Sequence, residues 1–486
     1  MKTKQLYTRL VMIILALIGF SIRLYHVNAP IADWHSWRQV DTAAVARNYL
    51  KNGINLLRPR YDDLSNIQTG KDNPMGWRMV EFPLYQFIAV GFKQVVGIFT
   101  IEVWLRLVSI AAITFGALLL GLLVSHYSDL VTGIVVEAVM LFLPYSIYYG
   151  RTILPDISSM TLAIASVYGV AKAFTDTEKK SITIQWFWIF LGSLFAACSL
   201  LVKPVGGFLL LPAAYLFVSN HKHAKHWIIG LFVYSIIGLL PLVLWRQWIL
   251  QFPEGIASYQ WLLNEGGIRL KGAWFYWLFA ERLGKLILGY WGLIPFGIGI
   301  MLAPSKKEGW LYRWWGIGIL LFWIIVARGN VQHDYYQILV IPVVSIFVAK
   351  GFVFLFRNPF ISKRVACLMS LVTVAFMFAF SWYTIRTYFW INRPEIIEAG
   401  RAADALLPKG AKVIAPYNGD TTFLYQTNRA GWPIGFDIDG KIAMGATAYV
   451  TVSPTDNDFE TKTLAEKYTV LVRNDTFAII DLTKQR

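Results

Sequence analysis

The chain has 486 residues, a mean hydropathy of +0.50 and 56% hydrophobic against 15% charged residues. Soluble domains usually carry about 25% charged residues, so this composition excludes an ordinary soluble protein and predicts that much of the chain lies in lipid. The formal charge of +16 would suit a nucleic-acid-binding protein. However, Lys and Arg lie mainly between apolar runs and at their ends, as in membrane proteins, and we expect no nucleic-acid partner.

The N-terminal residues 1–9 are basic and lead into an apolar run with no small-residue cleavage site, which predicts a retained first span. A span needs about 20 mostly apolar residues, and we expect eleven runs to cross: residues 9–27, 104–125, 130–149, 157–174, 186–202, 204–219, 227–248, 284–303, 313–327, 337–356 and 364–388. A twelfth run, residues 81–99, contains Pro83, Gln86 and Lys93, and is predicted to be a helix lying in the interface.

The distribution of basic residues predicts the sidedness of the loops. With the N-terminus inside, the inner loops carry Lys179, Lys180, Lys222, Lys225, Lys306, Lys307, Arg357, Lys363 and Arg364. The short outer loops carry only Arg151, Lys203 and Arg328. This inside bias follows the positive-inside rule, and eleven crossings place the C-terminus outside. We expect a transmembrane domain over residues 1–389, with outer loops at 28–103 and 251–283, and a soluble extracytoplasmic domain over 390–486.

The soluble tail is predicted to be a small α/β domain without a catalytic motif. Pro394 opens a helical pattern that runs to Leu407, and Pro408 and Gly410 end it. Short β-type runs follow at residues 412–415, 448–452, 469–472 and 477–480. The fold class expected for the whole chain is mainly α: a polytopic transmembrane helical bundle with interfacial helices in the first outer loop and this small C-terminal domain. The two cysteines lie in apolar runs and predict neither a disulfide framework nor a metal site.

Polar residues of the first outer loop form the first candidate cluster, in DWHSWRQVDTAAVARNY from Asp33 to Tyr49. From about Gln39 the pattern is helical, and Arg38, Asp41 and Asn48 fall on one stripe beside an apolar one. This pattern is typical of an amphipathic helix at the interface. The alternative is structural, because Asp41 also fits a first-turn partner of the helix dipole.

Three further clusters lie at outer ends of predicted spans or between them: Tyr148-Tyr149-Gly-Arg151-Thr-Ile-Leu-Pro155-Asp156, Lys203-Pro204 and Gln332-His333-Asp334-Tyr335-Tyr336. A fourth, Glu81-Phe-Pro83-Leu-Tyr85, opens the predicted interfacial helix. Each has a structural alternative: Glu81 as a helix-dipole partner, Asp156 as a helix cap and Lys203 as a snorkelling charge. Glu137 is the exception at mid-span, where ionisable groups are costly.

The motifs WRQVDTAAVARNYL, EFPLYQ, RTILPD and HDYYQ occur in an order that resembles the GT-C glycosyltransferases. The resemblance is to the protein O-mannosyltransferase-like and aminoarabinose-transferase-like branch, glycosyltransferase family 39, and covers about residues 9–390 in layout. It implies an integral membrane glycosyltransferase, a hexosyl- or pentosyltransferase, that uses a polyprenyl-phosphate sugar on the outer face of the membrane, usually with inversion. An acid of the first outer loop then acts near the acceptor, and basic and tyrosine residues of later loops hold the donor phosphate.

The chain departs from this family at two motifs. Relatives carry an Asp-Glu pair in the first loop, but when Ala46-Arg47 is aligned, Arg38 and Gln39 stand there. The acidic role is therefore carried to Asp41, one helical turn further on. A Lys-Pro-Pro motif of relatives is replaced by the sequence at residues 81–83, and Lys203 then compensates for the missing lysine.

The chemistry expected of these residues is transfer from a phosphate leaving group, which needs positive charge but no proton. The candidates that hold the phosphate are Lys203, Arg38, Tyr335 and Tyr336. Asp41, with Asp156 as second choice, would take the proton of the acceptor hydroxyl. The other substrate-binding candidates are Gln39, Glu81, Arg151 and His333. No metal-ligand spacing is convincing, so no cofactor is expected and a divalent metal stays an open alternative.

The partners expected are the polyprenyl-phosphate donor, a glycan, lipid or protein acceptor, and membrane lipid, at the cytoplasmic (inner) membrane of a bacterium. Three other functions stay open. A transporter or flippase predicts midplane polar residues and inverted repeats, for which Glu137 is weak support. A scaffold whose tail binds a partner predicts a featureless membrane region. A lipid-linked polysaccharide polymerase or ligase shares the outer-face site.

Overall fold

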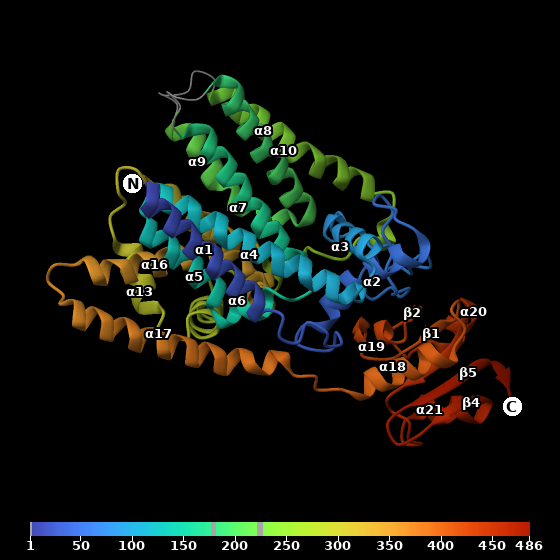
Figure 1. The fold of residues 1–486 in the computed structure, drawn as a ribbon. Coiled ribbons are helices and arrows are strands. Elements are labelled where there is room, and N and C mark those ends of the chain that lie inside the picture. The colour runs from blue at the N-terminus through green and yellow to red at the C-terminus, as the bar shows by residue number, and fades with distance from the viewer. Residues whose placement is uncertain (1, 176–180, 221–226) are drawn as a thin grey trace. The chain divides into compact units, whose positions relative to one another are not determined.

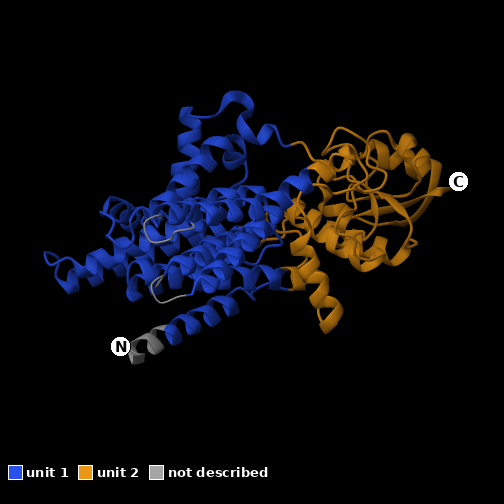
Figure 2. Cartoon of the chain, turned by 90° about the horizontal axis from the view of Figure 1, so that it is seen from above, with its two compact units in different colours: residues 1–27, 106–246, 259–387 blue, residues 28–105, 247–258, 388–486 orange. Residues whose placement is uncertain are grey.

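The computed structural model describes residues 2–175, 181–220 and 227–486. These residues pack as two compact units (Figure 2). Unit 1 comprises residues 1–27, 106–246 and 259–387, and unit 2 comprises residues 28–105, 247–258 and 388–486. Four of the basic residues used to predict sidedness lie outside the described residues: Lys179, Lys180, Lys222 and Lys225.

Unit 1 is built from helices, and every run predicted to cross the membrane overlaps at least one of them. They are α1 (Lys2–Ile22), α4 (Ile101–Tyr127), α5 (Leu130–Phe142), α6 (Pro144–Tyr149), α7 (Pro155–Phe174), α8 (Ile182–Val202), η1 (Pro204–Leu210), α9 (Leu211–Ser219), α10 (Trp227–Ile249), α11 (Trp261–Asn264), η3 (Glu265–Gly267), α12 (Gly272–Phe275), η4 (Tyr276–Ile287), α13 (Leu293–Met301), α14 (Leu311–Ile325), α15 (Ala327–Gln332), η5 (Asp334–Val340), α16 (Ile341–Arg357) and α17 (Lys363–Ile385). The first residues of α4 and the last of α10 belong to unit 2.

Six helical segments of the described chain are long and apolar enough to cross a membrane by themselves: Ile101–Tyr127, Pro155–Phe174, Ile182–Val202, Trp227–Ile249, Asp334–Arg357 and Lys363–Phe389. Other predicted spans are shorter or interrupted. The run 130–149 breaks before Pro144, and the run 284–303 leaves the helix at 288–292, where Gly289 has φ +49°. Such breaks are tolerated at membrane depth where protein covers the backbone.

The helices of unit 1 differ in how much protein covers them. In its most apolar window the segment Asp334–Arg357 is 89% buried, whereas α10 and α17 are 17% and 22% buried. The central helix α16 packs against α5 and α13, and α7 packs against α8 and α9 (Figure 1). Gly351 of α16 makes the α13 contact close, because a Cβ there would lie 1.9 Å from the carbonyl oxygen of Pro295. Small residues permit this approach between helices in lipid.

Unit 2 combines the first predicted outer loop with the tail. Its elements are α2 (Ser36–Asn52), α3 (Leu84–Val96), η2 (Pro253–Gly255), η6 (Arg386–Phe389), α18 (Glu395–Leu406), β1 (Lys412–Ile414), α19 (Thr421–Gln426), β2 (Ala430–Trp432), α20 (Ile438–Ala443), β3 (Ala446–Thr451), α21 (Phe459–Lys467), β4 (Tyr468–Arg473) and β5 (Ala478–Gln485). With 13 residues, α3 is too short to cross a bilayer of about 30 Å, in agreement with its predicted interfacial position.

The five strands form one sheet in the order β2-β1-β3-β5-β4. β1 pairs in parallel with β2 and β3, and β5 pairs antiparallel with β3 and β4. Alternate residues enter different cores: Val450 and Ile479 pack with α18, and Tyr449 and Ile480 pack with α21. Both faces of the sheet are therefore covered. The predicted fold class is confirmed, and the three-residue strand β2 is the strand of the described tail that the sequence pattern missed.

Candidate functional site

Three breaks between helices position the polar motifs of unit 1. α7 begins at Pro155, which places Asp156 in its first turn. α8 ends before Lys203, whose extended backbone leads into η1. α15 ends before His333, and Asp334 opens η5. Since η1 and η5 both pack on α7, the three breaks come together. We call Tyr149, Asp156, Lys203, His333, Asp334, Tyr335 and Tyr336 the lysine–tyrosine cluster.

Lys203 carries the positive charge of this cluster. Its Nζ donates a hydrogen bond of 2.5 Å to Oδ1 of Asp156. The same Nζ lies 4.9 Å and 5.3 Å from the ring centroids of Tyr336 and Tyr335, as in cation–π contacts. Asp156 is fully buried, and its Oδ2 has no hydrogen-bond partner among the described residues. Lys203 is also buried, with 8% of its surface exposed.

Two tyrosines of α6 hold the turn that precedes η5. Tyr149 Oη donates to Oδ1 of Asp334 at 2.6 Å, and Tyr145 Oη donates to the carbonyl oxygen of Asp334 at 2.8 Å. The ring of His333 stacks on that of Tyr335 with centroids 5.1 Å apart. The phenols and the imidazole are therefore fixed beside Lys203, although the motifs that carry them are far apart in sequence.

Arg151, a predicted substrate-binding residue, lies inside unit 1 rather than at its surface. It is 1% exposed and donates to the carbonyl oxygen of His26 at 3.3 Å. Sequence reasoning named Glu137 as the exceptional mid-span ion, but Arg23 and Arg106 are fully buried as well. Both arginines donate to main-chain carbonyls, whereas neither oxygen of Glu137 has a hydrogen-bond partner among the described residues. The two arginines therefore have a structural role, as hydrogen-bond donors to main-chain carbonyl oxygens.

Asp41 lies in unit 2 within a second cluster. Its Oδ2 accepts hydrogen bonds from Gln68 Nε2 and faces Arg78 Nη2, both at 3.0 Å. Its Oδ1 accepts from Thr421 Oγ1 at 2.7 Å. We call Asp41, Gln68, Arg78 and Thr421 the Asp41 cluster. Asp41 is 1% exposed, and α2 is buried from Arg38 to Ala46. The helix that was predicted as a surface amphipathic helix is therefore part of the core of unit 2, and it begins at Ser36 rather than at Gln39.

The other first-loop candidates also have close partners. Arg38 and Glu81, which were both predicted to bind substrate, form an ion pair with each other. Gln39 Nε2 donates to Oδ1 of Asp33 at 2.8 Å. Arg38, Asp41 and Asn48 were expected on one stripe, but each binds a different partner, and Asn48 donates to Asp62. The charge of Arg38 is therefore already balanced by a carboxylate.

A further acid of unit 2, Asp63, has a raised pKa. Burial raises the pKa of Asp63 to about 7, against hydrogen bonds from Ser65 that lower it. The backbone N–H of Ser65 donates to Oδ1 at 2.8 Å, and Oδ2 has no partner among the described residues. Asp63 is therefore held largely in its protonated form below neutral pH.

Sequence reasoning did not find Gln68, Arg78 or Thr421. Arg78 had a signal, because it stands three residues before Glu81 in GWRMVEFP. Gln68 and Thr421 had none, since loop and helix-start residues of these types are common. No three His, Cys, Asp or Glu residues within 2–175, 181–220 and 227–486 come together as metal ligands.

Comparisons with known proteins show a family match over part of the chain and a similar fold. A family model described as dolichyl-phosphate-mannose-protein mannosyltransferase matches residues 13–221, which include Asp41, Asp156 and Lys203. ArnT from Cupriavidus metallidurans bound to undecaprenyl phosphate is similar in fold, with 12% identity, 96% of this chain and 97% of that chain covered, and a TM-score of 0.66. The chain has the GT-C glycosyltransferase fold.

The Archaeoglobus fulgidus oligosaccharyltransferase in the apo form is also similar to this chain in fold, with 8% identity, 96% of this chain and 73% of that chain covered, and a TM-score of 0.60. No curated protein sequence matches. The fold that the resemblance of the four motifs implies is confirmed.

Proposed function

We propose that this protein is a membrane glycosyltransferase that moves a sugar from a polyprenyl-phosphate donor to an acceptor hydroxyl, with inversion, on the outer face of the cytoplasmic membrane. The observation that carries the proposal is the meeting of Lys203, Tyr335 and Tyr336 at helix breaks of a GT-C fold. The ArnT structure bound to undecaprenyl phosphate supports a lipid phosphate as the carrier. The bias of basic residues toward the inner loops supports the orientation, with the tail outside.

The donor role falls to the lysine–tyrosine cluster. When the anomeric C–O bond breaks, the electron pair stays on the phosphate oxygen, and a fixed cation stabilises it more in the transition state than in the ground state. Lys203 supplies a compact charge, and the Tyr335 and Tyr336 hydroxyls supply donors. We assign Asp156 to orienting Lys203, since their 2.5 Å contact fixes the ammonium group. Arg38 is a weaker phosphate ligand, because Glu81 balances its charge.

The acceptor role falls to Asp41. The acceptor oxygen attacks the anomeric carbon as the phosphate leaves, and its proton passes to a carboxylate; a single displacement of this kind inverts the configuration. A carboxylate offers about four lone-pair sites, and Arg78, Gln68 and Thr421 occupy three of those on Asp41. One site on Oδ1 is left to accept the proton.

The test is sugar transfer by the purified full chain in detergent. A panel of radiolabelled polyprenyl-phosphate sugars is supplied with a membrane extract from cells that lack the protein. We expect one donor to lose its label to a new product, and Asp41→Asn to reduce this transfer about 10²–10⁴-fold, the usual contribution of a general base.

The matched control is Asp62→Asn. Asp62 is another buried carboxylate of unit 2, paired with Arg47 at 2.5 Å, and its substitution should retain most of the transfer. An equal loss in both variants would make the effect of Asp41 structural. A folded wild-type protein that transfers no sugar from any donor would contradict the proposed function.

A further inference from the structure

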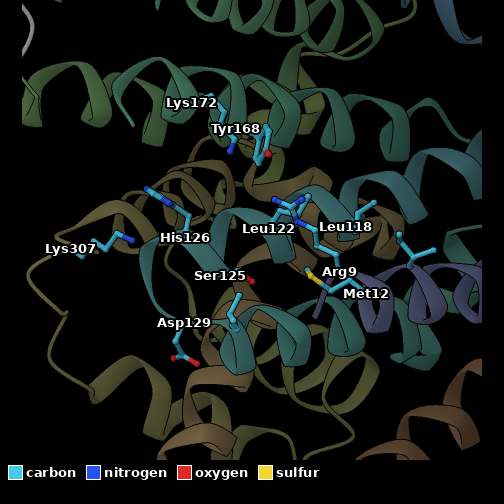
Figure 3. A pocket seen from close by; sticks show the side chains of 12 residues that line it. Arg9, Met12, Leu118, Leu122, Ser125, His126, Asp129, Tyr168, Lys172 and Lys307 are labelled. Carbon is cyan, nitrogen blue, oxygen red and sulfur yellow. The ribbon is translucent and has the colours of Figure 1, made fainter. Parts of the chain in front are cut away.

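A cavity of about 680 Å³ lies in unit 1, away from the lysine–tyrosine cluster. It is lined by the middle of α1, the start of α5, the C-terminal turns of α4 and α7, and the turn before α14 (Figure 3). Along α7, Lys172 follows Asp156 by 16 residues (172 − 156), or roughly 24 Å at 1.5 Å per residue. The cavity and the cluster therefore lie at opposite ends of one helix.

The lining is rich in cations. Lys172 and Tyr168 point into the space from α7, and Arg9, His126 and Lys307 reach it from other elements (Figure 3). Three of these residues have basic side chains, and His126 and Tyr168 add hydrogen-bonding groups. They come from four separate parts of the chain, so the folded bundle, and not a single basic run, concentrates the charge.

The acid of the lining does not cancel this charge. Asp129 caps α5, and its two oxygens accept hydrogen bonds from Arg357 at 2.7 Å and 2.8 Å. The acid next to Lys307, Glu308, is likewise held by Lys350 at 2.5 Å. Both carboxylates are therefore paired with cations that do not line the cavity.

The rest of the lining is apolar: Met12, Ile13, Leu118, Leu122 and Leu130. A free phosphate ion gains no favourable contact from an apolar surface, whereas a lipid presents a phosphate group next to hydrocarbon. The C-terminal turns of α4 and α7, the start of α5 and the turn before α14 are also ends that the positive-inside rule places at the inner leaflet, where the anionic lipids lie. We infer that this cavity binds an anionic phospholipid, with its phosphate against Arg9, Lys172 and Lys307 and the start of an acyl chain against the apolar residues.

The test is thermal unfolding of the purified full chain in micelles of neutral detergent. Dioleoyl-phosphatidylglycerol, dioleoyl-phosphatidylcholine or inorganic phosphate is titrated into separate samples. We expect phosphatidylglycerol to raise the unfolding midpoint in a saturable way, and the other two additions to leave it unchanged at the same concentrations. A site that serves a free anion would instead show the same rise with inorganic phosphate, which would overturn the inference.

Variants locate the effect. Arg9→Gln, Lys172→Gln and Lys307→Gln combined should raise the half-saturating phosphatidylglycerol concentration at least fivefold. The control removes three inner-loop charges that do not line the cavity: Lys306→Gln, Lys363→Gln and Arg364→Gln. If the triple variant does not fold, Lys307→Gln alone, at an exposed position, replaces it with an expected twofold rise. An unchanged response in the lining variants, or an equal loss in the control, would refute the site.

Discussion

The lysine–tyrosine cluster of unit 1 and the Asp41 cluster of unit 2 each hold a buried carboxylate, but they are built in different ways. In unit 1 the polar residues stand beside helix breaks that prolines and short motifs mark in the sequence. In unit 2 Asp41 lies inside a helix, and one of its donors, Thr421, comes from 380 positions away. The first kind of site is encoded locally, and the second exists only after the tail has folded onto the first loop.

The two clusters also differ in access. Lys203, His333 and Tyr336 keep exposures of 7–9%, whereas Asp41 keeps 1%. An enclosed carboxylate depends on the donors that surround it. Substitution of Lys203 should therefore act on charge, and substitution of a donor around Asp41 should act on the placement of that carboxylate.

Apart from Asp41→Asn, the largest effect is expected at Lys203. Lys203→Gln should reduce sugar transfer about 100-fold or more, since it removes the fixed charge that stabilises the leaving phosphate. The matched control is Lys350→Gln in the same unit: both side chains are 10% exposed, and both pair with a carboxylate at 2.5 Å. Initial rates with the labelled donor measure the difference. If Lys350→Gln lost as much transfer, the loss at Lys203 would reflect a broken ion pair in the fold.

A second prediction concerns the buried acids of unit 2. The pKa of Asp63 is raised to about 7 by burial, above its value near 4 in the unfolded chain. Between these values the folded protein holds a proton that the unfolded chain releases, so this group lowers the stability as the pH rises from about 4 to about 7. The unfolding free energy of the wild type should fall between pH 5 and pH 8. In Asp63→Asn this fall should be smaller by roughly 2 kcal/mol.

Urea unfolding at pH 5 and pH 8 measures this difference, and Asp475→Asn, at an exposed position, is the control. If the stability of Asp63→Asn fell with pH as steeply as that of the wild type, Asp63 would not be held protonated. Burial in unit 2 would then not raise the pKa of this acid.

A smaller effect on sugar transfer is expected from substitution of Thr421 in the C-terminal tail. Thr421→Val removes the hydroxyl that donates to Asp41 at 2.7 Å and leaves the shape of the side chain nearly unchanged. A hydrogen bond to a charged group contributes about 1.5–3 kcal/mol, so kcat should fall about tenfold while the donor KM stays the same. Thr421→Ser should restore most of the rate. An equal loss with serine would assign the effect to packing of α19 against α2.

The smallest effect is expected at Tyr149. Tyr149→Phe removes one donor to Asp334, but Tyr145 still holds the same turn through the carbonyl oxygen. The donor KM should rise about threefold with kcat nearly unchanged, because the hydrogen bond places His333, Tyr335 and Tyr336 and does not touch the phosphate. Steady-state kinetics separate the two constants. A large fall in kcat would show that the turn of η5 takes part in the transition state more directly than its neighbours suggest.

The sequence by itself determined the helical bundle, the short helix α3 and most of the tail strands, because hydrophobic runs, proline stops and β-type runs are local signals. It also determined which motifs carry the lysine–tyrosine cluster, since each lies at a helix break. Tertiary structure decided how these residues are used. Glu81 neutralises Arg38, main-chain carbonyls bind Arg151, and Thr421 completes the partners of Asp41. A buried ion takes whichever donors the fold brings to it, and that choice depends on contacts between residues far apart in the chain.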